Sequence, residues 1–129
     1  MKITKKIREE IFKKYDGHCA YCGCTLKKSW HIDHLKPIKR NDVGCDHPEN
    51  DNIDNLMPSC PQCNINKHQM TLEQFRASIY KFVESLEKYS VQYQMAKKFG
   101  LIEDTYNIIN FYFEIYNYNK GVKHENRIL

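Results

Sequence analysis

The sequence predicts a small α+β protein in which a cysteine-bearing module precedes a mostly helical extension. Three observations support this prediction: two Cys-x-x-Cys pairs, a short β-like segment between them, and a long helical pattern over residues 72–89. The chain has 129 residues, which is enough for about one domain with one modest core. We therefore expect the module to span residues 1–70 and the extension, packed on it, to span residues 71–129.

An amphipathic helix is expected at residues 4–15. Apolar side chains recur there at helical spacing, at Ile7, Ile11 and Tyr15. Thr4 is a suitable N-cap, because its hydroxyl can accept a hydrogen bond from a backbone amide of the first turn. We expect this helix to pack on the segment that follows it.

Between the two cysteine pairs the sequence predicts a strand and then a loop. The strand runs from His31 to Leu35, and Pro37 limits its length. Residues 41–55 are rich in Asn and Asp, which is typical of a loop. A helix is expected to begin at Pro61, because proline is tolerated in the first turn of a helix.

The second half of the sequence has one clear helical pattern and two less certain ones. In residues 72–89, with Thr71 as N-cap, the apolar residues follow steps of three and four; they are Leu72, Phe75, Ile79, Phe82, Val83, Leu86 and Tyr89. This face is expected to be buried on the module, in a dimer or against a target. Residues 91–99 either continue this helix or form another. Residues 108–116 alternate in a way that favours a strand, and a helix is the alternative.

The two cysteine pairs predict a structural zinc site. Each pair can present two thiolates from one tight turn, and two such turns complete a tetrahedral site with no open position. The four ligands would be Cys19, Cys22, Cys60 and Cys63. A redox pair, disulfides and free thiols are the alternatives, and Cys24 and Cys45 have no assigned role. The zinc would contribute on the order of 10 kcal/mol to folding.

Charge and compartment limit the class of protein. Lys and Arg number 20 and Asp and Glu 16, so the formal net charge is +4. This mild excess fits a polyanionic partner, with a solubilising surface as the alternative. No apolar run is long enough for a membrane span, and the first residues lack the apolar segment of a signal peptide. We expect a cytoplasmic protein with reduced cysteines and no membrane partner.

A second group of polar residues lies between and after the cysteine pairs. Asp33 and His34 are neighbours on the predicted strand, so they can serve one site only if the strand ends or bulges there. Asn64 and His68 are four residues apart, so they share one face of the predicted helix. Carboxylate and amide oxygens suit Mg²⁺ or Mn²⁺, and imidazole also suits Zn²⁺ and Ni²⁺. Such a set of groups fits metal-assisted phosphodiester hydrolysis.

These residues form the pattern C-x-x-C … H-I-D-H-L-x-P … N-x-x-N-L-x-P-x-C-x-x-C-N-x-x-K, which resembles the HNH nuclease family. The resemblance covers roughly residues 12–70. The size of the chain and the helical region after the motif also resemble small HNH endonucleases of phages and bacteria. It implies a ββα-metal core in a zinc-binding treble-clef frame. It also implies an enzyme that cleaves DNA with Mg²⁺ or Mn²⁺ as its catalytic metal, with Ni²⁺ as a further option.

The resemblance assigns roles to individual residues. His34 would be the general base, Asp33 the first metal ligand and Asn64 the second. Asn64 stands in the position of the family's final histidine, where many members have asparagine. Asn55 would orient the base or brace the loop, and His68 is a candidate additional ligand. Lys67 matches a frequent basic position and would contact phosphate. Further DNA contacts are expected from three basic residues that follow the predicted strand, Lys36, Lys39 and Arg40. His31, which shares a strand face with Asp33, is a further candidate for a DNA contact.

The sequence therefore predicts a DNA endonuclease whose zinc is purely structural. One active site per chain would nick one strand, so cutting both strands requires two events or a homodimer. The alternatives are a non-catalytic zinc module that binds nucleic acid, and an RNase or nuclease toxin on the same core. His31 has a structural hydrogen bond as its alternative role.

Overall fold

The computed structural model describes residues 1–121, which form two units. Unit 1 combines Met1–Thr71 with the segment that begins at Asn110, and unit 2 is Leu72–Ile109. The two units mix helices with two small two-stranded sheets, which confirms the α+β prediction. The last residues of the expected extension, 122–129, lie outside the described part of the chain.

No helix in the described part of the chain combines the length and apolar character that a membrane crossing requires.

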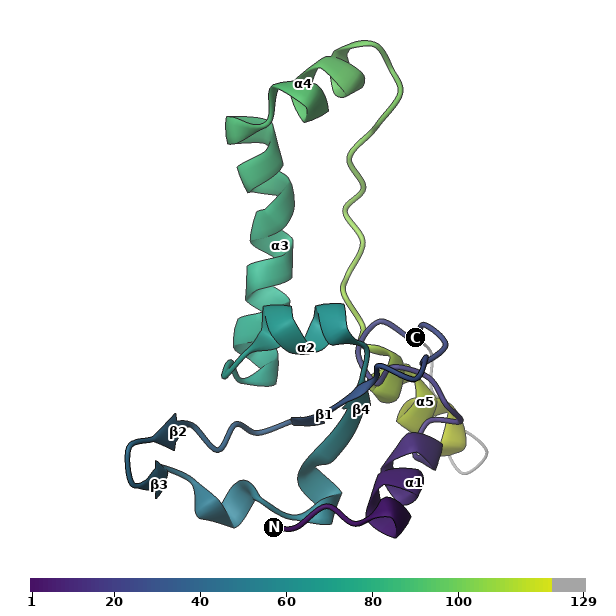
Figure 1. Ribbon diagram of the computed structural model, residues 1–129. Helices are drawn as coiled ribbons and strands as arrows, with labels where there is room; N and C mark the ends of the chain where they lie inside the picture. The colour runs from purple at the N-terminus through teal and green to yellow at the C-terminus, as the bar shows by residue number, and fades with distance from the viewer. Residues whose placement is uncertain (122–129) are drawn as a thin grey trace. The chain divides into compact units, whose positions relative to one another are not determined.

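Helix α1 (Lys5–Lys13) opens unit 1 and is capped as the sequence predicts. The Thr4 hydroxyl accepts a hydrogen bond from the backbone amide of Ile7 at 3.2 Å. Ile11, at the centre of the apolar stripe, is completely buried. Figure 1 shows α1 beside α5, and the rings of Tyr15 and Tyr116 meet edge to face between them.

Two antiparallel strands and a helix form the centre of unit 1. Strand β1 (His31–His34) pairs with β4 (Leu56–Ser59), with Asp33 opposite Met57 and His34 opposite Leu56. Every residue of β4 is buried, so this strand supports β1 from the core. Helix α2 (Pro61–Lys67) follows β4 directly and packs on β1 (Figure 1). The expected start of this helix at Pro61 is confirmed.

The Asn/Asp-rich segment between β1 and β4 is more ordered than a plain loop. It contains a short hairpin, β2 (Arg40–Asn41) with β3 (Gly44–Cys45). Two turns of 3-10 helix follow, at Pro48–Asn50 and Ile53–Asn55. Asn52 caps the second turn by accepting from the Asn55 amide and also donates to the Glu49 carbonyl, and such side-chain contacts explain why the composition resembles that of a loop.

Helix α5 (Tyr112–Gly121) returns to unit 1. The favoured strand at residues 108–116 is wrong: residues 108–111 form no regular element, and from residue 112 the alternative, a helix, is present. The amides of Tyr112 and Phe113 donate hydrogen bonds to the carbonyls of Tyr21 and Ala20, at 3.0 and 2.8 Å. Phe111 and Phe113 are both buried and both contact the Tyr21 ring. The alternation in the sequence therefore reflects two aromatic anchors at the start of a helix.

Unit 2 is built from two helices. Helix α3 (Leu72–Tyr89) matches the predicted range, and α4 (Val91–Lys98) is a separate helix. Ser90 divides them, because its hydroxyl caps the amide of Tyr93 at 3.2 Å. Burial of the α3 stripe differs from the expectation: Phe75 is buried, but the middle of the stripe is more than two-fifths exposed, at Phe82, Val83 and Leu86.

Candidate active site and zinc centre

Four cysteines converge in unit 1, as the sequence predicts. The Sγ atoms of Cys19, Cys22, Cys60 and Cys63 all lie within 4.8 Å of one another. Those of Cys22 and Cys60 are 3.9 Å apart. Zinc–sulfur bonds of about 2.3 Å in a tetrahedron separate the sulfurs by about 3.8 Å, so the cluster fits a four-thiolate zinc site.

Hydrogen bonding within the cluster already favours one thiolate. The pKa of Cys19 is lowered to about 4, first because Cys63 donates a hydrogen bond to its sulfur. Burial raises the pKa of Cys22 to about 12, and the shared proton raises the pKa of Cys63. Four adjacent thiolates need a cation between them, and a bound divalent ion would supply it.

Asp33 is held by two buried donors. The Tyr21 hydroxyl donates to Asp33 Oδ2 at 2.5 Å, and Lys67 Nζ lies 3.0 Å from the same oxygen. Asp33 is 6% exposed. Among residues 1–121, no side chain or amide bonds the other carboxylate oxygen, Oδ1. One carboxylate oxygen is thus fixed by the protein and the other is available to a ligand.

The side chain of Lys67 points into the core, not outward as a phosphate contact would require. Its side chain is completely buried, and Nζ also donates a hydrogen bond to the His34 carbonyl at 2.8 Å. The ammonium therefore ties α2 to the end of β1 from inside the core. Lysine is rarely buried unless it is paired with a carboxylate. The sequence could not show this inward direction, because the partner carboxylate is far from Lys67 in the sequence.

Tyr21 stays protonated and acts as a hydrogen-bond donor. Burial, followed by the negative charge of Asp33, raises the pKa of this phenol far above its ordinary value. The sequence does not mark Tyr21 as a site residue, because an aromatic residue inside a Cys-x-x-Cys turn is ordinarily a packing residue. Its hydroxyl connects the zinc turn to Asp33.

Asn64 faces β1 from α2. Its Nδ2 donates to His31 Nδ1 at 2.7 Å, so the amide oxygen points away from this contact. The side-chain contact of His31 is therefore a structural hydrogen bond within the protein, the alternative given above to a DNA contact. The Asn64 oxygen has no hydrogen-bond partner in the described part of the chain.

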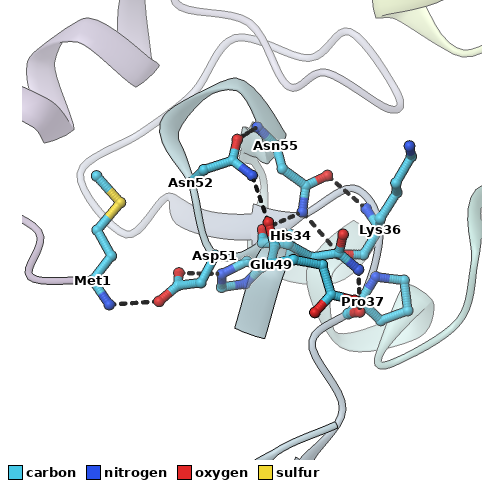
Figure 2. A network of polar contacts seen from close by, with 9 residues as sticks. Met1, His34, Lys36, Pro37, Glu49, Asp51, Asn52 and Asn55 are labelled. Carbon is cyan, nitrogen blue, oxygen red and sulfur yellow. Dashed lines mark hydrogen bonds and ion pairs between the residues drawn. The ribbon is translucent and has the colours of Figure 1, made fainter. Parts of the chain in front are cut away.

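His34 contacts the loop on the far side of β1. Its Nε2 lies 2.9 Å from Asp51 Oδ1, and Asp51 Oδ2 accepts a hydrogen bond from the Met1 amine at 2.5 Å (Figure 2). The bond from His34 and then the amine lower the pKa of Asp51. The sequence does not mark Asp51 as a site residue, because it is one of several acidic residues in an Asn/Asp-rich loop and nothing local distinguishes it.

Asn55 braces the segment that carries Asp51. Its side chain accepts from the Lys36 amide at 2.9 Å and donates to the Lys36 and Asn50 carbonyls at 2.8 and 2.7 Å. Its own carbonyl accepts from the Leu35 amide at 2.9 Å. These bonds, drawn in part in Figure 2, join the residues after β1 to the loop that contacts His34.

One pocket of about 460 Å³ brings most of the predicted residues together. Its lining includes Asp33, His34, Lys39, Arg40, Asn64 and His68. Asp33 and His34 reach the same pocket because β1 ends at His34. Of the other predicted residues, Lys36 is exposed and lies outside the lining. His31 and Lys67 bond to the lining residues Asn64 and His34, whereas Asn55 bonds to Lys36 and Asn50 next to the pocket.

His68 stands at the end of α2 in an unusual conformation. Its φ is 50° and ψ is −127°, a region that side chains rarely adopt, and its side chain is exposed at the pocket. Such strain is concentrated at binding and catalytic sites.

Comparison with known proteins gives one family match. The sequence model of the HNH endonuclease family matches residues 19–70, a range that holds all four cysteines and the pocket. No curated protein matches the chain.

Proposed function

Residues 19–70 form a domain of the HNH endonuclease family, and on this premise we propose that the chain is a metal-dependent endonuclease that hydrolyses phosphodiester bonds in DNA. The observation that supports the proposal is the single pocket lined by Asp33, His34 and Asn64. A base and two oxygen ligands around one space are the groups that such hydrolysis requires.

The donor atoms at the pocket fit a hard divalent cation. Asp33 offers a carboxylate oxygen and Asn64 an amide oxygen, neither bonded to another described residue. We assign Mg²⁺ or Mn²⁺ to these two ligands, with His68 as a third candidate and Ni²⁺ as an option because of its imidazole. When bound, this ion would stabilise negative charge on the scissile phosphate and the leaving oxygen.

His34 is proposed as the general base. Its ring lies at the pocket and is held by a carboxylate, and a neutral imidazole can take a proton from an attacking water. The carboxylate that holds the ring belongs to Asp51, in the loop braced by Asn55, so the base is fixed in direction before substrate binds.

The four-cysteine centre is assigned a structural role. Four thiolates fill a tetrahedral zinc site and leave no position for water or phosphate. Cys60 and Cys63 begin α2, whereas Cys19 and Cys22 flank Tyr21, which bonds to Asp33. A zinc ion at this centre would fix the helix that carries Asn64 relative to the strand that carries Asp33.

The charge at the pocket suits a nucleic acid. Lys39 and Arg40 are exposed and line the pocket, and Lys36 is exposed nearby in the sequence. Lysine and arginine side chains of this kind bind phosphates and release counterions. With Lys67 buried, we assign the phosphate contacts to these three residues.

The test is nicking of supercoiled plasmid by the full-length zinc-loaded protein with Mg²⁺ or Mn²⁺. We expect cleavage that EDTA stops and that His34→Ala reduces by at least about a hundredfold. His47→Ala is the matched control, because His47 is an exposed histidine in the same loop region and should leave the rate unchanged. Wild-type nicking by His34→Ala would overturn the assignment of the base. Cleavage of RNA alone would overturn the DNA substrate.

A further inference from the structure

We infer that Asp51 is a positioning residue, which holds His34 with its Nε2 protonated and its Nδ1 lone pair free to accept a proton. This inference rests on the proposed function, since it assumes that His34 is the base. It adds a residue and a specific ring atom to that proposal, and neither follows from the family motif in the sequence.

The direction of the hydrogen bond determines which ring nitrogen is basic. A carboxylate has no proton to give, so across the 2.9 Å contact the His34 Nε2–H must be the donor and Asp51 Oδ1 the acceptor. A neutral imidazole carries one ring proton, and here it is on Nε2. The other nitrogen, Nδ1, is then the only ring atom able to take a proton from water.

Asp51 is itself held in place by its neighbours in the chain. Its amide donates to the Pro48 carbonyl at 3.1 Å, which closes the 3-10 turn before it. On one side the Asn50 carbonyl accepts from Asn55, and on the other the Asn52 side chain accepts from the Asn55 amide at 3.1 Å. The backbone on both sides of Asp51 is therefore held by hydrogen bonds, which fixes the position of its carboxylate.

Hydrogen bonds also join the loop that carries Asp51 to the residues just after β1. Asn50 Nδ2 donates to the Pro37 carbonyl at 3.1 Å, and Asn55 bonds to both backbone groups of Lys36. Figure 2 shows these contacts around the His34–Asp51 pair. The residues that follow His34 and the residues around Asp51 are thus one hydrogen-bonded structure, which suits the precise support of a catalytic ring.

The first test is spectroscopic and needs no activity. Wild-type zinc-loaded protein with ¹⁵N-labelled histidine should show an exchange-protected ring proton on Nε2 of His34, assigned by its loss in His34→Gln. Asp51→Ala should lose this protected signal, whereas Asp51→Glu should restore part of it. Asp42→Ala, which removes an exposed carboxylate from the same segment, should keep it. A wild-type ring proton on Nδ1, or a protected Nε2 proton in Asp51→Ala, would refute the inference.

The second test separates positioning from substrate binding. Asp51→Ala should lower kcat for plasmid nicking on the order of a hundredfold with little change in KM, and Asp42→Ala should leave both unchanged. Asp51→Asn keeps the shape of the side chain, and zinc content and thermal unfolding show whether each variant is folded. An unchanged kcat in folded Asp51→Ala contradicts the inference. If wild-type protein cleaves nothing, the proposed function fails, while the ring-proton measurement still decides the role of Asp51.

Discussion

The ammonium of Lys67 lies 3.0 Å from Asp33 Oδ2, and both side chains are buried. This pair joins α2 to β1 directly behind the pocket. Together with the Tyr21 hydroxyl, it sets the direction of the Asp33 carboxylate without help from a metal. The free oxygen of Asp33 is therefore oriented by the protein core.

Lys67→Met should destabilise the protein by about 3 kcal/mol, because it leaves a buried carboxylate without its cation. Urea unfolding of zinc-loaded protein measures this change. Lys36→Met is the matched control: its side chain is exposed, so the free energy of unfolding should change by less than about 0.5 kcal/mol. Equal stability of the two variants would show that the buried pair contributes nothing.

Asn55→Ala should cost about 2–4 kcal/mol of unfolding free energy. The side chain makes hydrogen bonds to Lys36 and Asn50, and its removal leaves three partly buried backbone groups unsatisfied. Asn66→Ala serves for comparison, because the Asn66 side chain is exposed and donates a hydrogen bond to the Gln62 carbonyl of its own helix. If Asn55→Ala lowers the free energy of unfolding no more than Asn66→Ala does, Asn55 does not brace the loop.

Cys60→Ser should lower bound zinc well below one ion per chain and lower the thermal midpoint sharply. Cys60 supplies one of the four clustered sulfurs and also caps α2. Zinc content by mass spectrometry and unfolding by circular dichroism measure the two effects. Cys45→Ser should change neither, since Cys45 lies outside the cluster. Full zinc content in Cys60→Ser would argue against four-thiolate coordination.

Gly23→Ala should destabilise the protein more than Gly100→Ala, by about 1–3 kcal/mol. Both glycines have a positive φ, of 81° and 75°, so both substitutions carry similar backbone strain. At Gly23 the added Cβ would also lie 2.6 Å from Cδ2 of Tyr112, whereas at Gly100 it meets nothing within 4 Å. If both variants lose the same free energy of unfolding, α5 does not pack closely against the first cysteine turn.

Features governed by local sequence could be predicted well. The range of α3, the Thr4 cap of α1 and the start of α2 at Pro61 depend on side-chain periodicity and on single capping residues. The cysteine cluster was equally accessible, because a thiolate pair at fixed spacing has few other uses. The placement of Asp33, His34 and Asn64 at one pocket is in keeping with the motif.

Features set by distant contacts could not be read from the sequence. The inward direction of Lys67 depends on Asp33, and the position of Asp51 depends on hydrogen bonds from Asn55. The start of α5 depends on two carbonyls far earlier in the chain, so its aromatic alternation suggested a strand. In each case a partner remote in sequence decides the direction of a side chain or the type of element.

The bonds from Tyr112 and Phe113 to the carbonyls of Tyr21 and Ala20 also set an order of events during synthesis. A ribosome that has completed residue 63 has already made every cysteine of the cluster, but not the amides that close the first cysteine turn. A cation that binds the four sulfurs could therefore be captured while the aromatic core of the nascent chain is still open. Burial of Tyr21 is completed only after translation has passed Phe113.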